Sequence, residues 1–241
     1  FLLYTYGIIL EEVISVRDYK ITEMVLFAFG YMILSIAILF ISNNYISVWL
    51  GINVGLAIIP LILITVLHKR LKQSEFGFDW LSMLLLIVFV FFFPNTFYVI
   101  TDLIHIDQGD YYTTQMYEAT IYHRNIEDYI FLFHVVMTLA IGVYAGVKSL
   151  LRFNEIFIQK DILKGTRFTF LFALIFLSSI GIYIGRFLRF FSWDILNPFT
   201  LMNEFLSSLD FFALLFIILF TLIQFVLYFG YRYFYESEPF N

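Results

Sequence analysis

The chain has 241 residues, of which 61% are hydrophobic and only 14% are charged, with a formal net charge of −5 at pH 7. Soluble globular domains carry about 25% charged residues, so this composition excludes an ordinary soluble domain and indicates that the bilayer is the solvent. The absence of cysteine excludes disulfides, thiolate metal sites and a cysteine nucleophile. We therefore expect an all-α polytopic transmembrane bundle, with residues 1–241 forming a single integral membrane domain.

Six stretches are apolar over the roughly 20 residues that a helix needs to cross a bilayer. Residues 1–10 are also apolar but too short to span, and they fit the tail of a partial seventh helix. No signal peptide is indicated, because no basic leader precedes this run and no small-residue cleavage site follows it. The six predicted spans are Glu23–Ile41, Tyr45–Leu67, Phe78–Ile100, Tyr129–Leu150, Thr169–Phe190 and Phe211–Tyr231.

Basic residues predict the orientation of the spans. With six spans, eleven of the fourteen basic residues fall on one side, including Lys148 and Arg152 in the connection between spans four and five. Both termini are therefore expected in the cytoplasm. The opposite, extracytoplasmic side carries nine acidic residues, and its two long segments are residues 101–128 and 186–210. The three basic residues on that side are Arg124, Arg186 and Arg189.

Three of the predicted spans carry two glycines one helical turn apart. This spacing lets helices approach closely, which matters in lipid because dispersion between backbones replaces the hydrophobic drive. We interpret the pairs as tight packing within one monomer, with a dimerisation face as the alternative. The pairs are Gly51 with Gly55, Gly142 with Gly146, and Gly181 with Gly185.

The third span ends in a run of polar residues. Pro94 removes a backbone hydrogen bond within this span, so a kink or a broken helix is expected there. If the segment continues as an α-helix, four polar side chains fall within an arc of about 80°. The sequence therefore predicts a polar stripe at the membrane boundary. Its members are Asn95, Tyr98, Asp102 and His105.

The fifth span ends with Arg186, Arg189 and Trp193 on one helical face. A paired guanidinium costs less near lipid than an unpaired one, so we expect Asp102 to pair with Arg186 or Arg189. This pair is either a structural clamp or part of a binding site. Asp194, at a similar depth, completes the predicted ligand-binding set formed by the stripe and this face.

Metal and enzyme chemistry have weaker support. Asp102 and His105, with His123, His134 and Asp107, offer nitrogen and oxygen ligands for zinc or manganese. No spacing typical of a metal site is present, so no metal and no other cofactor is expected. No serine lies in a nucleophile elbow, and catalytic residues stay unassigned.

Two motifs follow one another along the chain, Pro94-Asn-x-x-Tyr98-x-x-Thr101-Asp102-Leu103-x-His105 and Gly185-Arg186-x-x-Arg189-x-x-Ser192-Trp193-Asp194. They resemble the two signature segments of a bacterial membrane protein family known as domain of unknown function 1361. A third segment of that family is similar to Gly142-Val-Tyr-x-Gly146-x-x-Ser149. Phe191 departs from the pattern, because the family often has Asn before Ser-Trp-Asp. The resemblance covers spans two to six and implies an extracytoplasmic polar site without naming its ligand.

We expect a binding or accessory membrane subunit whose outer polar pocket takes a small anion, a lipid headgroup or a partner protein. A small-solute transporter or transporter subunit is one alternative, suggested by Pro94 and the glycine-rich spans. An envelope enzyme that uses Asp102 or His105 as a general base on a lipid-linked substrate is another. The expected partners are membrane lipids and a partner membrane protein, with no nucleic acid. The expected location is the bacterial cytoplasmic membrane.

Overall fold

The computed structural model describes residues 22–23, 25–73, 78–114, 120–159, 164–190 and 197–236. These residues are mostly helical, and the two short strands β1 (Tyr112–Thr113) and β2 (Ile121–Tyr122) form an antiparallel hairpin. The helical elements are Val25–Ser42, α2 (Ile46–Gln73), α3 (Trp80–Phe92), α4 (Pro94–Tyr98), η1 (Val99–Gln108), α5 (Ile126–Gln159), α6 (Lys164–Tyr183), η2 (Ile184–Leu188), α7 (Pro198–Ser207) and α8 (Phe211–Glu236).

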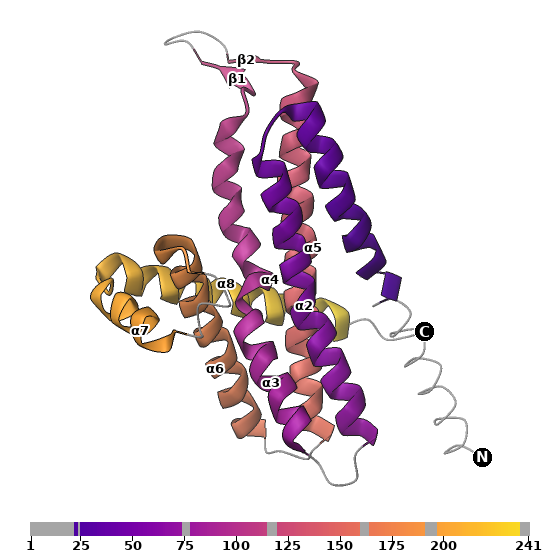
Figure 1. Ribbon diagram of the computed structural model, residues 1–241, viewed down its shortest axis with the longest axis vertical. Helices are drawn as coiled ribbons and strands as arrows, with labels where there is room; N and C mark the ends of the chain where they lie inside the picture. The colour runs from indigo at the N-terminus through magenta and orange to yellow at the C-terminus, as the bar shows by residue number, and fades with distance from the viewer. Residues whose placement is uncertain are drawn as a thin grey trace, which may run out of the picture.

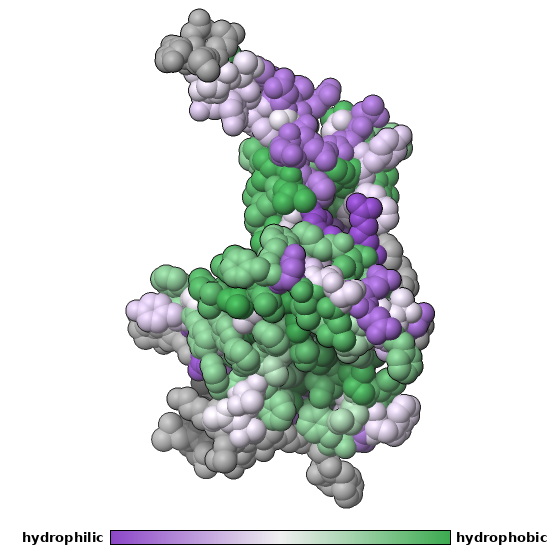
Figure 2. All heavy atoms as spheres, turned by 90° about the vertical axis from the view of Figure 1, so that its left-hand side faces the viewer, coloured by the Kyte–Doolittle hydropathy of each residue, from purple (hydrophilic) through white to green (hydrophobic). Residues whose placement is uncertain are grey.

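All the long helices except α8 lie side by side along the longest axis of the molecule (Figure 1). We call the end that carries β1 and β2 the hairpin end. The opposite end, where α2 finishes with Arg70 and Lys72, is the basic end. The α6 helix lies along the half of the bundle nearer the basic end (Figure 1). Figure 2 shows hydrophilic residues gathered toward the hairpin end and hydrophobic residues over most of the rest of that face, as expected for a protein surrounded by lipid.

Six helical stretches among the described residues are long and apolar enough to cross a membrane. This confirms the predicted all-α class. The last of them, α8, has 26 residues and is about 39 Å long. Figure 1 shows α8 running across the long axis, behind α2 and α5, where the other five stretches follow that axis. The sixth predicted span therefore agrees in length and composition but differs in direction.

The fourth span is longer than the sequence predicted. Because α5 continues to Gln159, Lys148 and Arg152 lie inside the helix and not in a connection. Both cations have partners there, which lowers the cost of keeping them close to lipid. The Lys148 ammonium lies 5.0 Å from the ring centroid of Tyr231, and Arg152 Nη1 lies 3.2 Å from Glu155 Oε2.

The paired glycines lie where helices of this one chain cross. A Cβ added to Gly142 of α5 would lie 2.5 Å from Val99 Cγ2, and one added to Gly181 of α6 would lie 2.6 Å from Pro94 Cγ. At Gly51 of α2, the added atom would meet a serine of the first helix at 2.7 Å. These contacts confirm close packing of α2, α5 and α6 within the monomer.

Hydrogen bonds between polar side chains join α8 to α6. Thr221 Oγ1 lies 3.0 Å from Ser179 Oγ, and Gln224 Nε2 donates to the same oxygen at 2.9 Å. All three side chains are buried. Since apolar surface gives little drive for helix association in lipid, such hydrogen bonds and close packing determine where helices meet. This contact fixes the point at which α8 crosses α6.

Candidate functional site

The site starts where the third span breaks. Proline has no amide hydrogen, so the carbonyl of Val90, four residues earlier, loses its usual helical partner, and α3 ends at Phe92. Two polar side chains bond carbonyls at the break: Asn95 Nδ2 donates to Phe92 O at 2.9 Å, and Thr96 Oγ1 donates to Phe93 O at 2.8 Å. The predicted break is thus confirmed, and Asn95 has a structural task there, because backbone groups at membrane depth need partners.

The backbone changes period after Tyr98, which alters the predicted stripe. The next ten residues form the 3₁₀ helix η1, with three residues per turn. Asp102 and His105, three residues apart, therefore lie one above the other on the same face. Asn95 instead bonds the carbonyl of its own break. The continuous α-helical stripe expected from the sequence is wrong, because it assumed 100° per residue throughout.

Asp102 and Arg186 form the centre of the site. Arg186 Nη1 lies 3.5 Å from Asp102 Oδ1, and Nη2 donates to Thr101 O at 3.0 Å. Asn53 Nδ2, from α2, donates to Asp102 Oδ2 at 2.8 Å. The guanidinium also contacts Tyr98, with Nη1 3.4 Å from its hydroxyl and the ring centroid 5.8 Å away. The prediction that Asp102 pairs with Arg186 or Arg189 is confirmed, and the partner is Arg186. We call the five residues that meet here the polar cluster: Asn53, Tyr98, Thr101, Asp102 and Arg186.

The polar cluster joins three transmembrane segments. Asn53 belongs to α2, Asp102 to η1 and Arg186 to the end of the α6 segment. Asp102 is only 2% exposed, and the side chain of Arg186 is 16% exposed. A carboxylate and a guanidinium buried together neutralise each other and accept or donate several hydrogen bonds, which makes burial of both tolerable.

Arg186 owes its position to a local change in α6. The helix passes into the π turn η2, and that turn ends at Arg189, whose φ of 59° is in the left-handed region. A residue other than glycine in that region is uncommon and stops the helix there. Arg189 is exposed, in contrast to the half-buried Arg186. Trp193 and Asp194, the remaining predicted site residues, lie outside the described residues.

The histidines suggested as metal ligands lie in separate places. His123 Nδ1 is 3.0 Å from Asp110 Oδ2 at the hairpin, and its Nε2 lies 2.8 Å from Thr113 Oγ1. His134 Nε2 lies 2.9 Å from Ser35 Oγ, between α5 and the first helix. Within the described ranges, no three His, Cys, Asp or Glu side chains come close enough to hold a metal ion.

Asn53 and Thr101 are members of the cluster that the sequence analysis did not select. Asn53 had a detectable signal, since it is a polar residue in the middle of an apolar span. Thr101 contributes its backbone carbonyl, while its hydroxyl donates to Tyr98 O at 2.7 Å. A backbone acceptor has no signal in the residue types of a sequence.

The length, apolar surface and number of these helices define a multi-pass helical membrane protein. A family model described as "Protein of unknown function (DUF1361)" matches residues 49–227, a range that includes the entire polar cluster. The chain therefore belongs to this family, as its motifs implied. A search of curated proteins and a search of solved structures each found no match.

Proposed function

We propose that the chain is a binding or accessory membrane subunit. It holds an anionic group at the C-terminal end of the α6 segment, where Arg189 is the cation that contacts the anion. One observation carries this proposal. Arg186 is occupied by Asp102, Thr101 and Tyr98, whereas Arg189 directly follows the π turn with an exposed side chain.

The charges of this region favour an anion. Asp102 supplies one negative charge, and Arg186 and Arg189 supply two positive charges, so the three together carry a net positive charge. A guanidinium binds phosphate or carboxylate through two parallel hydrogen bonds, and such bonds are stronger where water is scarce. The region is therefore suited to a phosphate or carboxylate group.

The Asp102–Arg186 pair acts in this account as a clamp. It ties η1 to the end of the α6 segment, and Asn53 adds α2 to the same point. Because these contacts fix the last turn before Arg189, the exposed arginine is presented from a rigid base. Ordering the cation in advance reduces the entropy lost when an anion binds.

Native mass spectrometry of the protein extracted with its own lipids tests this proposal. We compare wild type, Arg189→Gln and the control Arg124→Gln, which removes another exposed cation at the hairpin end. A bound anionic species should be present in wild type and Arg124→Gln and lost from Arg189→Gln. Equal retention by all three proteins, or no anionic species on wild type, would contradict the proposal.

Two probes then separate the sources of the anion. Inorganic phosphate and phosphatidylglycerol are added in turn to protein stripped of lipid. Binding of both in an Arg189-dependent way indicates that the phosphate alone is recognised, whereas binding of phosphatidylglycerol only indicates a membrane lipid as the ligand. If neither probe needs Arg189, the proposed anion site is wrong.

A further inference from the structure

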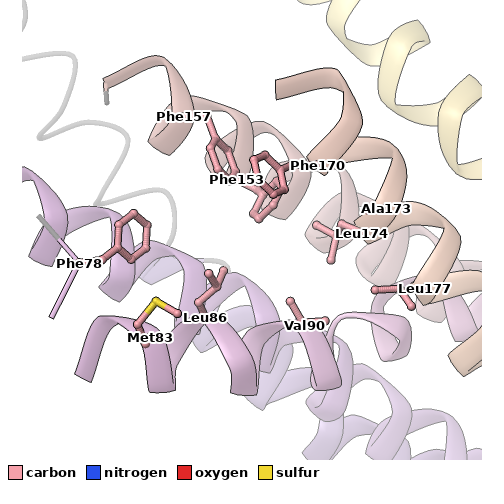
Figure 3. A pocket seen from close by; sticks show the side chains of 10 residues that line it. All are labelled: Phe78, Met83, Leu86, Val90, Phe153, Phe157, Phe170, Ala173, Leu174 and Leu177. Carbon is pink, nitrogen blue, oxygen red and sulfur yellow. The ribbon is translucent and has the colours of Figure 1, made fainter. Parts of the chain in front are cut away.

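A groove of about 310 Å³ lies toward the basic end, on the other side of the break at Pro94 from the polar cluster. Figure 3 shows one wall formed by α3 and by Phe78, two residues before it, and the other formed by α5 and α6, with side chains from both walls directed toward the space between them. All of its lining side chains are apolar. They are Phe78, Met83, Leu86, Val90, Phe153, Phe157, Phe170, Ala173, Leu174 and Leu177.

The groove has a buried floor and an exposed rim. Phe153 and Leu174 of the floor are 5% and 3% exposed, whereas Met83 and Leu177 of the rim are 47% and 51% exposed. Both α3 and α6 belong to helical stretches long and apolar enough to cross a membrane. The open side of the groove therefore meets the hydrocarbon of the bilayer, and an apolar occupant is required.

The length and lining of the groove suit a hydrocarbon chain. From Phe170 to Leu177 the wall is about 10 Å long, and the space between the walls is about 310 Å³. Because every lining side chain is apolar, the part of the occupant that lies between the walls is apolar too.

A cation lies at the end of the groove nearer the basic end. Arg167 is three residues before Phe170, which places it on the same side of α6 and about 4.5 Å further along the axis. Its Nε atom is buried and has no hydrogen-bond partner among the residues that the structure describes. Since Nε is covered by protein, the terminal nitrogens of the guanidinium are the ones that can donate to a phosphate oxygen.

We propose that this groove binds one acyl chain of a phospholipid from the leaflet at the basic end, and that the phosphate of that lipid lies on Arg167. The two features fit the order of groups in a phospholipid, with an apolar chain beside Phe170 and an anionic phosphate one turn nearer the membrane surface. The proposal does not depend on the anion site at Arg189.

Lipid titrations followed by native mass spectrometry test the groove. The background is Arg189→Gln, so that a lipid held by Arg189 is not counted. Ala173→Trp places a large ring in the groove, and Ala37→Trp makes the same change at an exposed alanine of the first helix. Dioleoyl phosphatidylglycerol should bind about tenfold more weakly to the first variant and unchanged to the second.

Arg167→Gln tests the phosphate contact, with Lys72→Gln as the control at the same end. Loss of one charge-assisted contact should weaken phosphatidylglycerol binding about tenfold. Binding of dioleoylglycerol, which has the same acyl chains and no phosphate, should not change. Inorganic phosphate should not displace the lipid, because the acyl chain supplies much of the affinity.

Any of three results would overturn the proposal. If Ala173→Trp binds the lipid as tightly as Ala37→Trp does, the acyl chain does not lie in the groove. If Arg167→Gln and Lys72→Gln behave alike, or if free phosphate competes fully, the phosphate of a lipid is not held at Arg167.

Discussion

The polar cluster, on the hairpin side of the break at Pro94, and the groove near the basic end join helices in different ways. In the polar cluster, α2, η1 and the α6 segment are tied by hydrogen bonds and one ion pair with defined geometry. Around the groove, α3 faces α5 and α6 through aromatic and aliphatic side chains only. In lipid, an apolar side chain gains little free energy when it moves from contact with acyl chains to contact with another helix. Polar contacts can therefore fix helices, while apolar walls can leave room for a lipid.

The break at Pro94 separates the two regions. The proline ring packs against Gly181, where an added Cβ would lie 2.6 Å from Cγ. On the hairpin side of this contact, the chain passes through α4 into η1 and reaches the polar cluster. On the other side, α3 forms one wall of the groove. One close contact between α4 and α6 thus divides a polar region from an apolar one.

The largest effect should come from removing one charge of the polar cluster. Asp102→Ala leaves the guanidinium of Arg186 and the amide of Asn53 without their carboxylate. Breaking a buried pair in this way should reduce the free energy of unfolding by about 3 kcal/mol. Denaturant titration of the protein in detergent micelles measures this. A loss below about 1 kcal/mol would show that the polar cluster does not hold α2, η1 and the α6 segment together.

A smaller loss in the free energy of unfolding is expected at the contact between Pro94 and Gly181, which separates the two regions. Gly181→Ala forces a methyl group against the rigid ring of Pro94, and overpacking of this kind costs about 1–3 kcal/mol. Gly230→Ala is the matched control, because an added Cβ there meets nothing within 4 Å. The midpoint of thermal unfolding should fall for the first variant only. Equal midpoints would mean that α4 and α6 are not in close contact.

The hydrogen bonds between α6 and α8 should contribute less. Ser179→Ala removes the acceptor of Gln224 Nε2, and contacts of this kind in membranes contribute about 0.6 kcal/mol on average. The neighbouring Ser178→Ala should cost nothing or stabilise slightly, since Ser178 Oγ is buried without a partner within the described part of the chain. The same denaturant titration compares both. If Ser178→Ala costs more than Ser179→Ala, the assigned crossing point of α8 is wrong.

The smallest effect is expected outside the spans, at the start of α3. Hydrogen bonds from Arg70 and Ser82 hold the pKa of Asp79 well below its usual value. A depressed pKa means that the contribution to stability is present above the unfolded pKa of about 4 and is lost as pH falls toward the folded pKa. The unfolding midpoint should therefore fall slightly more below pH 4 in wild type than in Asp79→Asn. Parallel curves would contradict this.

The sequence predicted the features that depend on composition and on single residues. Six apolar stretches, the break at Pro94, the glycine contacts and the Asp102–Arg186 pair were all confirmed. Each has a local cause: apolar length, a missing amide hydrogen, a missing side chain, or a charge that needs a partner in lipid.

The features that the sequence did not predict depend on how segments meet. The 3₁₀ period of η1 moved Asp102 and His105 off the expected stripe. The direction of α8 follows from its contacts with other helices, since polar residues such as Thr221 and Gln224 do not by themselves give the angle at which it crosses α6. The groove likewise has no sequence signal, because residues that leave a gap and residues that fill one are chemically alike.

The coupling free energy between Asp102 and Arg186 tests most directly the claim that charge fixes the region around the polar cluster. A double-mutant cycle compares Asp102→Ala, Arg186→Ala and the double variant by denaturant titration in micelles. Since each single variant leaves a buried charge without its partner, the double variant should lose less than the sum of the two, by about 1–3 kcal/mol. Additive losses would show that the two residues do not stabilise each other, and would contradict the account of the clamp.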